Sequence, residues 1–242
     1  MPLLLNVLLM DKFFFKDIEA ILFDFEGTLV DFQWNLTGAV RETMEMLKIS
    51  GFPVDRLQGC KYSTLMNEAM KIAIERRQPP GEVREKIGEI YDQYDEDALT
   101  RWTLRPNARH FLFAVKTKGM KTGLVSNVGK KAMEKAFKRM ELQQLFDAVV
   151  TRNDVETLKP SGEGIRLVLS RLHVIKDRAL FIGDSVDDIR AANEVGMNVM
   201  IILGGENPRP DLLRAQPHVL VNHYDELLRC FEEIEGIDLD GI

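Results

Sequence analysis

Three aspartates in this sequence are spaced in a way that could bind a metal ion. Asp24 directly follows the apolar run 20–23, and Asp184 and Asp188 follow the apolar run 179–182. Carboxylates that approach one another repel unless a cation lies between them, and an all-oxygen set of this kind suits a hard ion such as Mg²⁺. The pattern therefore predicts a magnesium site formed by Asp24, Asp184 and Asp188.

Two further stretches supply a hydroxyl group and a positive charge. Ser126 and Asn127 follow the apolar run 121–125, and Lys159 lies in the loop after the run 148–150. Phosphoryl transfer depends mainly on positioning and on the neutralisation of charge, which a lysine, a hydroxyl and a metal ion supply together. These stretches indicate a site for a phosphoryl group.

Asp24 and Glu26 together could divide such a transfer into two steps. With Asp24 as the nucleophile, an aspartyl-phosphate intermediate replaces one difficult displacement by two easier ones. Glu26 would protonate the departing alkoxide in the first step and activate a water molecule in the second.

The elements that must position these residues are short strands that alternate with amphipathic helices. From Pro106, which suits the first turn of a helix, the pattern predicts strands at 121–125, 148–150, 179–182, 198–203 and 218–221, and a last helix at 224–234. This alternation predicts an α/β fold, a Rossmann-like parallel sheet with helices on both faces. Ligands of such sheets bind beyond the carboxyl ends of the strands, where all four stretches would meet.

Between Trp34 and Leu104 the sequence pattern is helical and contains no convincing strand. We therefore predict a core domain made of residues 1–33 and 105–242 and an inserted all-helical cap domain made of residues 34–104. Four side chains near the two crossings, for which packing or solvent exposure is the simpler interpretation and substrate contact the alternative, are Trp34, Trp102, Arg101 and Arg105.

Composition excludes several classes of function. The formal net charge of −6 argues against a nucleic-acid-binding surface. The apolar start at 3–10 is too short to span a membrane, although it is compatible with packing on the core or with a homodimer contact. The two cysteines, Cys60 and Cys230, match no metal-binding spacing and suit reduced thiols of a cytoplasmic protein.

In this order, the four stretches resemble the motifs of the haloacid dehalogenase (HAD) superfamily. The motifs read Asp24-Phe-Glu-Gly-Thr-Leu, Ser126-Asn127, Lys159-Pro160 and Gly183-Asp184 with Asp188. From about residue 18 to residue 231 the chain is similar to the phosphoglycolate-phosphatase-like subgroup, which carries a helical cap of the C1 type after the first motif. The resemblance implies a magnesium-dependent phosphatase that hydrolyses phosphate monoesters of small metabolites through an aspartyl-phosphate on Asp24.

The resemblance also implies roles for individual residues. Asp24 is the nucleophile and a magnesium ligand, and Glu26 offers its backbone carbonyl to the metal and its side chain as acid and base. Asp184 binds the metal directly and Asp188 directly or through water, whereas Asp187 is a neighbour. The residues expected on the substrate side are Thr28, which supports the loop, Ser126 and Asn127 in the phosphoryl pocket, and Lys159, which neutralises charge between Asp24 and the phosphate.

Glu26 departs from the family pattern, because phosphatases of this superfamily usually carry aspartate there. Glutamate pushes the carboxyl out by one C–C bond, roughly 1.5 Å, and a displacement of about 1 Å can cost a catalytic group on the order of a hundredfold in rate. The alternatives that stay open are a 2-haloacid dehalogenase, a phosphomutase, and a non-catalytic domain that binds a phosphorylated ligand or a protein.

Overall fold

The structure of the protein is a computed structural model, which describes residue 15 and residues 17–232. Its strands form one parallel six-stranded sheet in the order β3-β2-β1-β4-β5-β6. They are β1 (Ala20–Phe23), β2 (Lys121–Val125), β3 (Ala148–Val150), β4 (Ala179–Gly183), β5 (Asn198–Ile202) and β6 (Val219–Val221). Every residue of β1 and of β4 is buried, which explains why both read as continuous apolar runs rather than as alternating ones.

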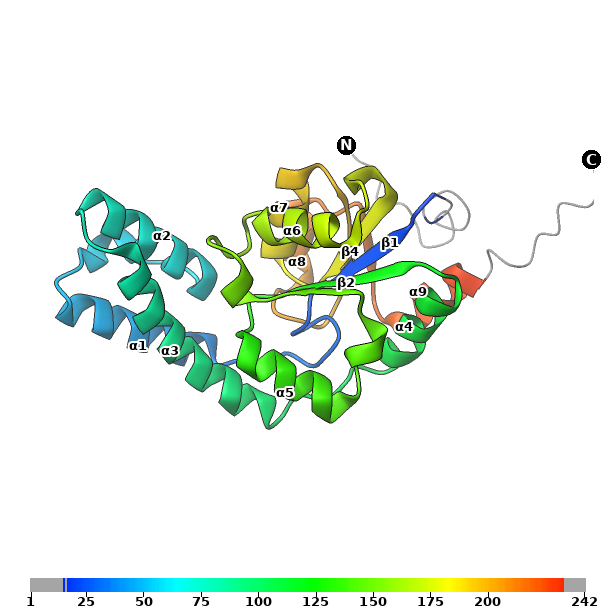
Figure 1. The fold of residues 1–242 in the computed structure, drawn as a ribbon, viewed down its shortest axis with the longest axis horizontal. Coiled ribbons are helices and arrows are strands. Elements are labelled where there is room, and N and C mark those ends of the chain that lie inside the picture. The colour runs from blue at the N-terminus through cyan, green and yellow to red at the C-terminus, as the bar shows by residue number, and fades with distance from the viewer. Residues whose placement is uncertain (1–14, 16, 233–242) are drawn as a thin grey trace, which may run out of the picture.

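Helices cover both faces of this sheet, as Figure 1 shows. On one face lie α6 (Glu163–Leu172), α7 (Val186–Val195) and α8 (Arg209–Ala215); on the other lie α4 (Ala108–Thr117), α5 (Lys130–Met140) and α9 (Tyr224–Glu232). The predicted α/β Rossmann-like fold is thereby confirmed. Single 3-10 turns complete the connections at η3 (Gln143–Leu145), η4 (Arg152–Asp154) and η5 (Lys176–Arg178).

Some predicted boundaries differ from those observed. The helix expected to begin at Pro106 begins at Ala108, because Asn107 adopts a left-handed conformation with φ of 62° that a helix interior does not allow. The strand expected at 198–203 ends at Ile202, and the one expected at 218–221 begins at Val219. The apolar start at 3–10 and the end of the last predicted helix, 233–234, lie outside the described residues.

Three helices between the first two strands form a separate block, which we call the helical block. It consists of α1 (Leu36–Ile49), α2 (Tyr62–Glu75) and α3 (Pro80–Leu99), with the short turn η2 (Val54–Leu57), and it lies to one side of the sheet in Figure 1. Proline suits the first position of α3, because the N–H group that proline lacks would have no acceptor within the helix there. The predicted domain boundaries fall at the two ends of this block and stay a prediction.

Two crossing segments, residues 31–35 and 100–105, connect the helical block to the sheet and run side by side. The backbone N–H of Asp31 donates to the carbonyl of Thr103 at 3.0 Å, and the Thr103 hydroxyl donates to the Asp31 carboxylate at 2.6 Å. These two hydrogen bonds hold the crossing segments together.

A buried polar network fastens α3 to the core. Asp95 is 1% exposed and accepts hydrogen bonds from the Trp34 indole at 2.9 Å, the Gly129 backbone at 2.9 Å and the Arg152 guanidinium at 2.8 Å. Arg152 is 2% exposed and also contacts Asp92. Because a buried charge is costly without partners, each member of the network depends on the others.

We expect Asp95→Asn to lower the free energy of unfolding by about 2–3 kcal/mol, because the new amide group would face two donors and leave the Arg152 charge less compensated. Urea unfolding measures this change. The matched control is Asp97→Asn on the same helix, whose pair with Arg101 is exposed and should contribute less than about 1 kcal/mol. Equal losses in the two variants would contradict the prediction.

No helix in the described part of the chain combines the length and the apolar composition that a membrane crossing requires. The cytoplasmic location and the homodimer stay predictions.

Candidate active site

The site begins where β1 ends, at the centre of the sheet. The backbone N–H of Asp24 donates to the carbonyl of Ile182 at 2.9 Å, so β4 holds the position of Asp24. The chain then turns at Gly27, whose φ is +84° and where a Cβ atom would lie 2.3 Å from a carboxylate oxygen of Asp184. Only glycine allows the loop to pass this close to Asp184.

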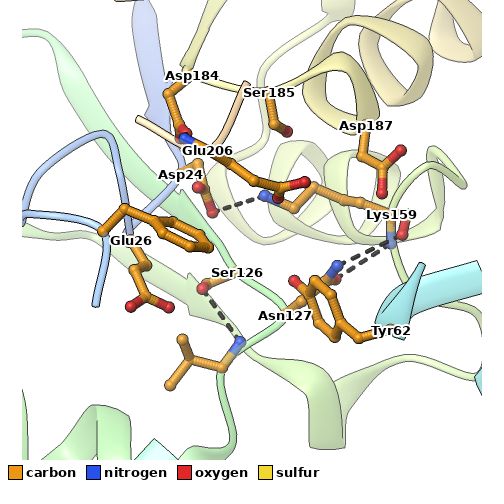
Figure 2. A pocket seen from close by; sticks show the side chains of 12 residues that line it. Asp24, Glu26, Tyr62, Ser126, Asn127, Lys159, Asp184, Ser185, Asp187 and Glu206 are labelled. Carbon is orange, nitrogen blue, oxygen red and sulfur yellow. Dashed lines mark hydrogen bonds and ion pairs between the residues drawn. The ribbon is translucent and has the colours of Figure 1, made fainter. Parts of the chain in front are cut away.

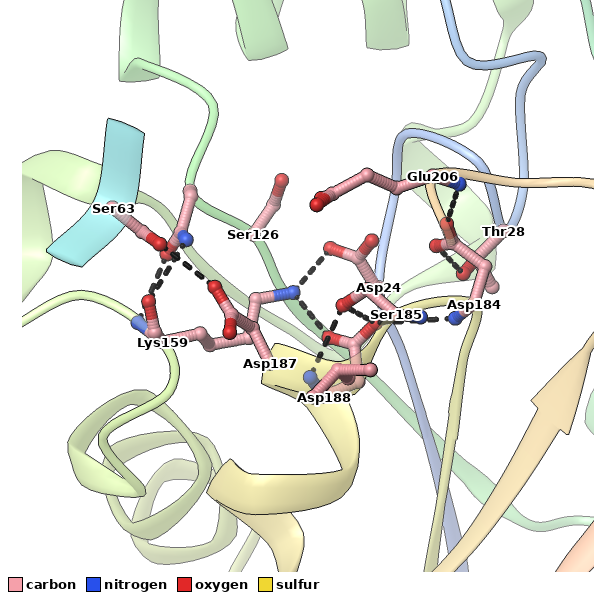
Figure 3. A network of polar contacts seen from close by, with 12 residues as sticks. Asp24, Thr28, Ser63, Ser126, Lys159, Asp184, Ser185, Asp187, Asp188 and Glu206 are labelled. Carbon is pink, nitrogen blue, oxygen red and sulfur yellow. Dashed lines mark hydrogen bonds and ion pairs between the residues drawn. The ribbon is translucent and has the colours of Figure 1, made fainter. Parts of the chain in front are cut away.

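The three predicted metal ligands meet at this point. Asp24, Asp184 and Asp188 are all buried, and each offers a carboxylate oxygen within 4.8 Å of those of the other two. The Lys159 ammonium lies 2.6 Å from Asp24 and 2.7 Å from Asp188, as Figure 3 shows. Four stretches far apart in the sequence therefore converge at the carboxyl edge of the sheet.

The cluster contains three carboxyl groups but one ammonium group, and burial and neighbouring charges shift their pKa values. Burial raises the pKa of Asp24 to about 6 against the lowering effect of Lys159, and burial followed by the neighbouring carboxylates raises the pKa of Asp184 well above its usual value. Burial alone would lower the pKa of Lys159, but Asp188 and Asp24 outweigh it and raise that pKa. Three carboxylates with one lysine leave an excess of negative charge that favours a further cation.

The donor set fits a divalent ion. Hard carboxylate oxygens are the ligands that Mg²⁺ prefers, and the cluster supplies them from three separate residues. The orientation of Asp184 is fixed because its two oxygens accept from the Thr28 hydroxyl at 2.8 Å and from the Glu206 backbone at 2.6 Å. A Cβ atom at Gly205 would lie 2.0 Å from Asp184, so this loop also needs glycine to pass so close to the carboxylate.

Asp188 is positioned by the first turn of α7. Ser185 caps this helix in a reciprocal capping box: its hydroxyl accepts from the Asp188 backbone, and one oxygen of Asp188 accepts from the Ser185 backbone at 3.0 Å and its hydroxyl at 2.7 Å. The other oxygen faces Lys159. The same local motif that starts the helix thus aims a carboxylate at the site.

Ser126 and Asn127 directly follow β2, and their side chains make different hydrogen bonds. Both line the same pocket as Asp24, as Figure 2 shows. The Asn127 side chain also brackets the Lys159 backbone, accepting from its N–H at 3.2 Å and donating to its carbonyl at 3.4 Å. Asn127 therefore holds the loop that carries the lysine, while the Ser126 hydroxyl accepts from the Val128 backbone at 3.2 Å.

Comparisons with known proteins agree with this geometry. Residues 21–202 match the family model described as haloacid dehalogenase-like hydrolase. The chain belongs to this family.

Phosphoglycolate phosphatases are among the curated relatives of this hydrolase. The one from Salmonella choleraesuis is 28% identical over 90% of this chain and 94% of its own, and the one from Escherichia coli K12 is 27% identical over 88% and 92%. Among solved structures, a hydrolase from Pseudomonas syringae has a TM-score of 0.65 at 22% identity, covering 89% of this chain and 98% of its own. The predicted family is confirmed, and the likeness to the solved structure confirms the fold.

Glu26, the departure of this hydrolase from the family pattern, is held by both crossing segments. One of its carboxyl oxygens accepts from the Gln33 backbone and from the Trp102 indole, each at 2.8 Å. Burial, only partly offset by these hydrogen bonds, raises the pKa of Glu26 to about 8. At neutral pH the carboxyl therefore carries a proton, as an acid that protonates a leaving group must.

This shift predicts a pH dependence of stability that Glu26→Gln should remove. Folded Glu26 keeps its proton up to about pH 8 and unfolded Glu26 releases it near the usual 4.5, so the wild type loses stability as pH rises through this window. The amide oxygen of the variant can keep both hydrogen bonds. Between pH 5 and pH 9, its free energy of unfolding should therefore rise relative to that of the wild type by about a few kcal/mol. Urea unfolding of both proteins in a chelator measures the difference, and parallel pH profiles would refute it.

The sequence did not reveal several residues that line the pocket. Tyr62 comes from the start of α2, Phe32 from the first crossing segment and Glu206 from the loop after β5. Asp187, predicted to be a neighbour of the metal site, lines the pocket and accepts from the Ser63 hydroxyl at 2.7 Å. Only the place of Glu206 shortly after a strand end could have indicated it.

Proposed function

We propose that this hydrolase is a magnesium-dependent phosphatase of small phosphate monoesters, with Asp24 as its nucleophile. The observation that carries the proposal is the buried cluster in which the oxygens of Asp24, Asp184 and Asp188 lie within 4.8 Å of one another beside Lys159. The names of the curated relatives, phosphoglycolate phosphatases, support the same reaction type. A dehalogenase needs no metal ion, so the acidic pair Asp184 and Asp188 favours the phosphatase.

In the first half-reaction, an oxygen of Asp24 attacks phosphorus and the bond from phosphorus to the ester oxygen breaks. The alkoxide that departs takes the proton of Glu26. In the second half-reaction, Glu26 accepts a proton from water, the water oxygen attacks phosphorus, and Asp24 is released with inorganic phosphate. Each half-reaction returns Glu26 to the state that the other one needs.

The remaining residues bind and orient the phosphoryl group. Lys159 offsets the charge between Asp24 and the phosphate, and the Ser126 hydroxyl donates to a phosphoryl oxygen. The three aspartates and the Glu26 backbone carbonyl would hold Mg²⁺, which would supply positive charge to the phosphoryl oxygens when bound. Asn127 and Thr28 act through their hydrogen bonds to the Lys159 backbone and the Asp184 carboxylate.

In this proposal the helical block, within residues 34–104, is the cap that closes over the site. Tyr62 from α2 lines the pocket beside Asp24, and Asn67 of the same helix exchanges two hydrogen bonds of 3.0 Å with the backbone of Leu158. A cap in this place excludes water from the reacting groups.

The test is the release of phosphate from a generic aryl phosphate in Mg²⁺ and in a chelator. We expect turnover in Mg²⁺, none in the chelator, and recovery when Mg²⁺ is restored. Turnover that persists at the same rate in the chelator would show that the reaction does not require a metal ion. No turnover of aryl or small alkyl phosphates in Mg²⁺ would reject the phosphatase.

A further inference from the structure

One wall of the pocket is acidic. Glu206 and Asp187 both line it, and in Figure 3 the Glu206 carboxyl reaches over Asp24 towards Ser126. The Glu206 side chain is 10% exposed and Asp187 is 5% exposed, so water screens neither charge well. A substrate bound with its phosphoryl group at Asp24 would direct its leaving alcohol towards this wall.

The cations described near this wall balance it only in part. Among the residues that line the pocket, the one basic side chain is Lys159, which already contacts Asp24 and Asp188. Lys61 pairs with Glu206 at 2.8 Å, but its side chain is 44% exposed and approaches from outside the pocket lining. Lys61 offsets the charge of Glu206 but forms no ion pair with Asp187 in the described residues, so the two carboxylates and one ammonium keep a net negative charge.

The pocket is also small. Its free volume is about 30 Å³ with the helical block in this position, whereas one water molecule needs about 10–15 Å³. A short alcohol part therefore fits this position of the helical block best, and any charge that it carries would lie close to the wall.

We propose that the preferred substrates are phosphate monoesters of short alcohols that carry an ammonium group. This inference rests on the proposed phosphatase function and specifies its substrate class. An ammonium would pair with Glu206 and Asp187, whereas a carboxylate at the same position would meet two like charges in a poorly hydrated pocket. Phosphoglycolate, which the names of the curated relatives indicate for those enzymes, would be a poor substrate here.

Three two-carbon phosphates of similar size test the inference: 2-aminoethyl phosphate, 2-hydroxyethyl phosphate and glycolate 2-phosphate. We expect kcat/KM in Mg²⁺ to fall in that order, with at least about a tenfold ratio between the amine and the carboxylate. Glu206→Gln should reduce this ratio about fivefold or more, because one of the two carboxylates that discriminate the substrates is lost. The wild-type ratio tests the inference even if the variant fails to fold.

A matched control is Glu194→Gln, which removes a carboxylate from a 2.8 Å ion pair with Arg166 on the surface of the core and should leave the ratio unchanged. If aryl phosphate is hydrolysed but glycolate 2-phosphate equals or exceeds the amine, or if Glu206→Gln leaves the ratio unchanged, the inference is wrong and the phosphatase stands. If the protein hydrolyses neither aryl phosphate nor any of the three, both proposals fail together.

Discussion

Asp24→Asn is expected to reduce kcat for aryl phosphate hydrolysis by at least about 10⁴-fold, because an amide is a poor nucleophile for phosphorus. Asparagine has nearly the same shape, so the fold should persist, and circular dichroism verifies this. Phosphate release measures the loss. Wild-type enzyme quenched in acid during turnover should carry one covalently bound phosphoryl group, and the variant none.

A control for this substitution is Asp177→Asn, which alters an exposed aspartate paired with Lys176 and should keep full activity. Residual activity of Asp24→Asn within tenfold of the wild type would show that another residue is the nucleophile. In that case the trapped phosphoryl group would also map to a different peptide.

Lys159→Met should lower kcat by about 10³-fold and, in a chelator, lower the free energy of unfolding by about 3–5 kcal/mol. Lys159 is 5% exposed and lies against two carboxylates, so its loss leaves the buried aspartates without their nearest positive charge. Addition of Mg²⁺ should stabilise this variant more than it stabilises the wild type, because binding to the folded state offsets the missing charge. Urea unfolding with and without Mg²⁺ measures both effects.

The comparison for Lys159 is Lys116→Met, which breaks a 2.8 Å pair with Asp147 whose side chains are 29% and 38% exposed. Partial exposure limits the expected loss to about 1 kcal/mol, with no change in kcat. If both lysine variants lost equal stability, or if Mg²⁺ failed to stabilise Lys159→Met, the proposed balance of charge at the site would be wrong.

The sequence was sufficient to predict the fold and the residues that converge at the sheet edge. Runs such as 20–23 and 179–182 read as buried strands because both faces of the sheet are covered, and parallel strands must end at the same edge. The positions of Asp24 and Asp184 follow from that rule alone. Asp188 follows from it together with the helix start at Ser185, a signal that is local in the sequence.

Only the tertiary structure decided the surroundings of these residues. The partners of the Glu26 carboxyl, Gln33 and Trp102, come from two crossing segments, and Trp102 lies 76 positions away in the sequence. Glu206 enters the pocket because the loop after β5 lies beside Asp184, and Tyr62 enters it because α2 lies against the core. No periodicity or motif encodes such contacts, since they depend on how separate elements pack. The strand ends determine where chemistry can occur, and the packing of the helical block and loops determines the pKa of Glu26, the charge of the pocket wall and the space left for a substrate.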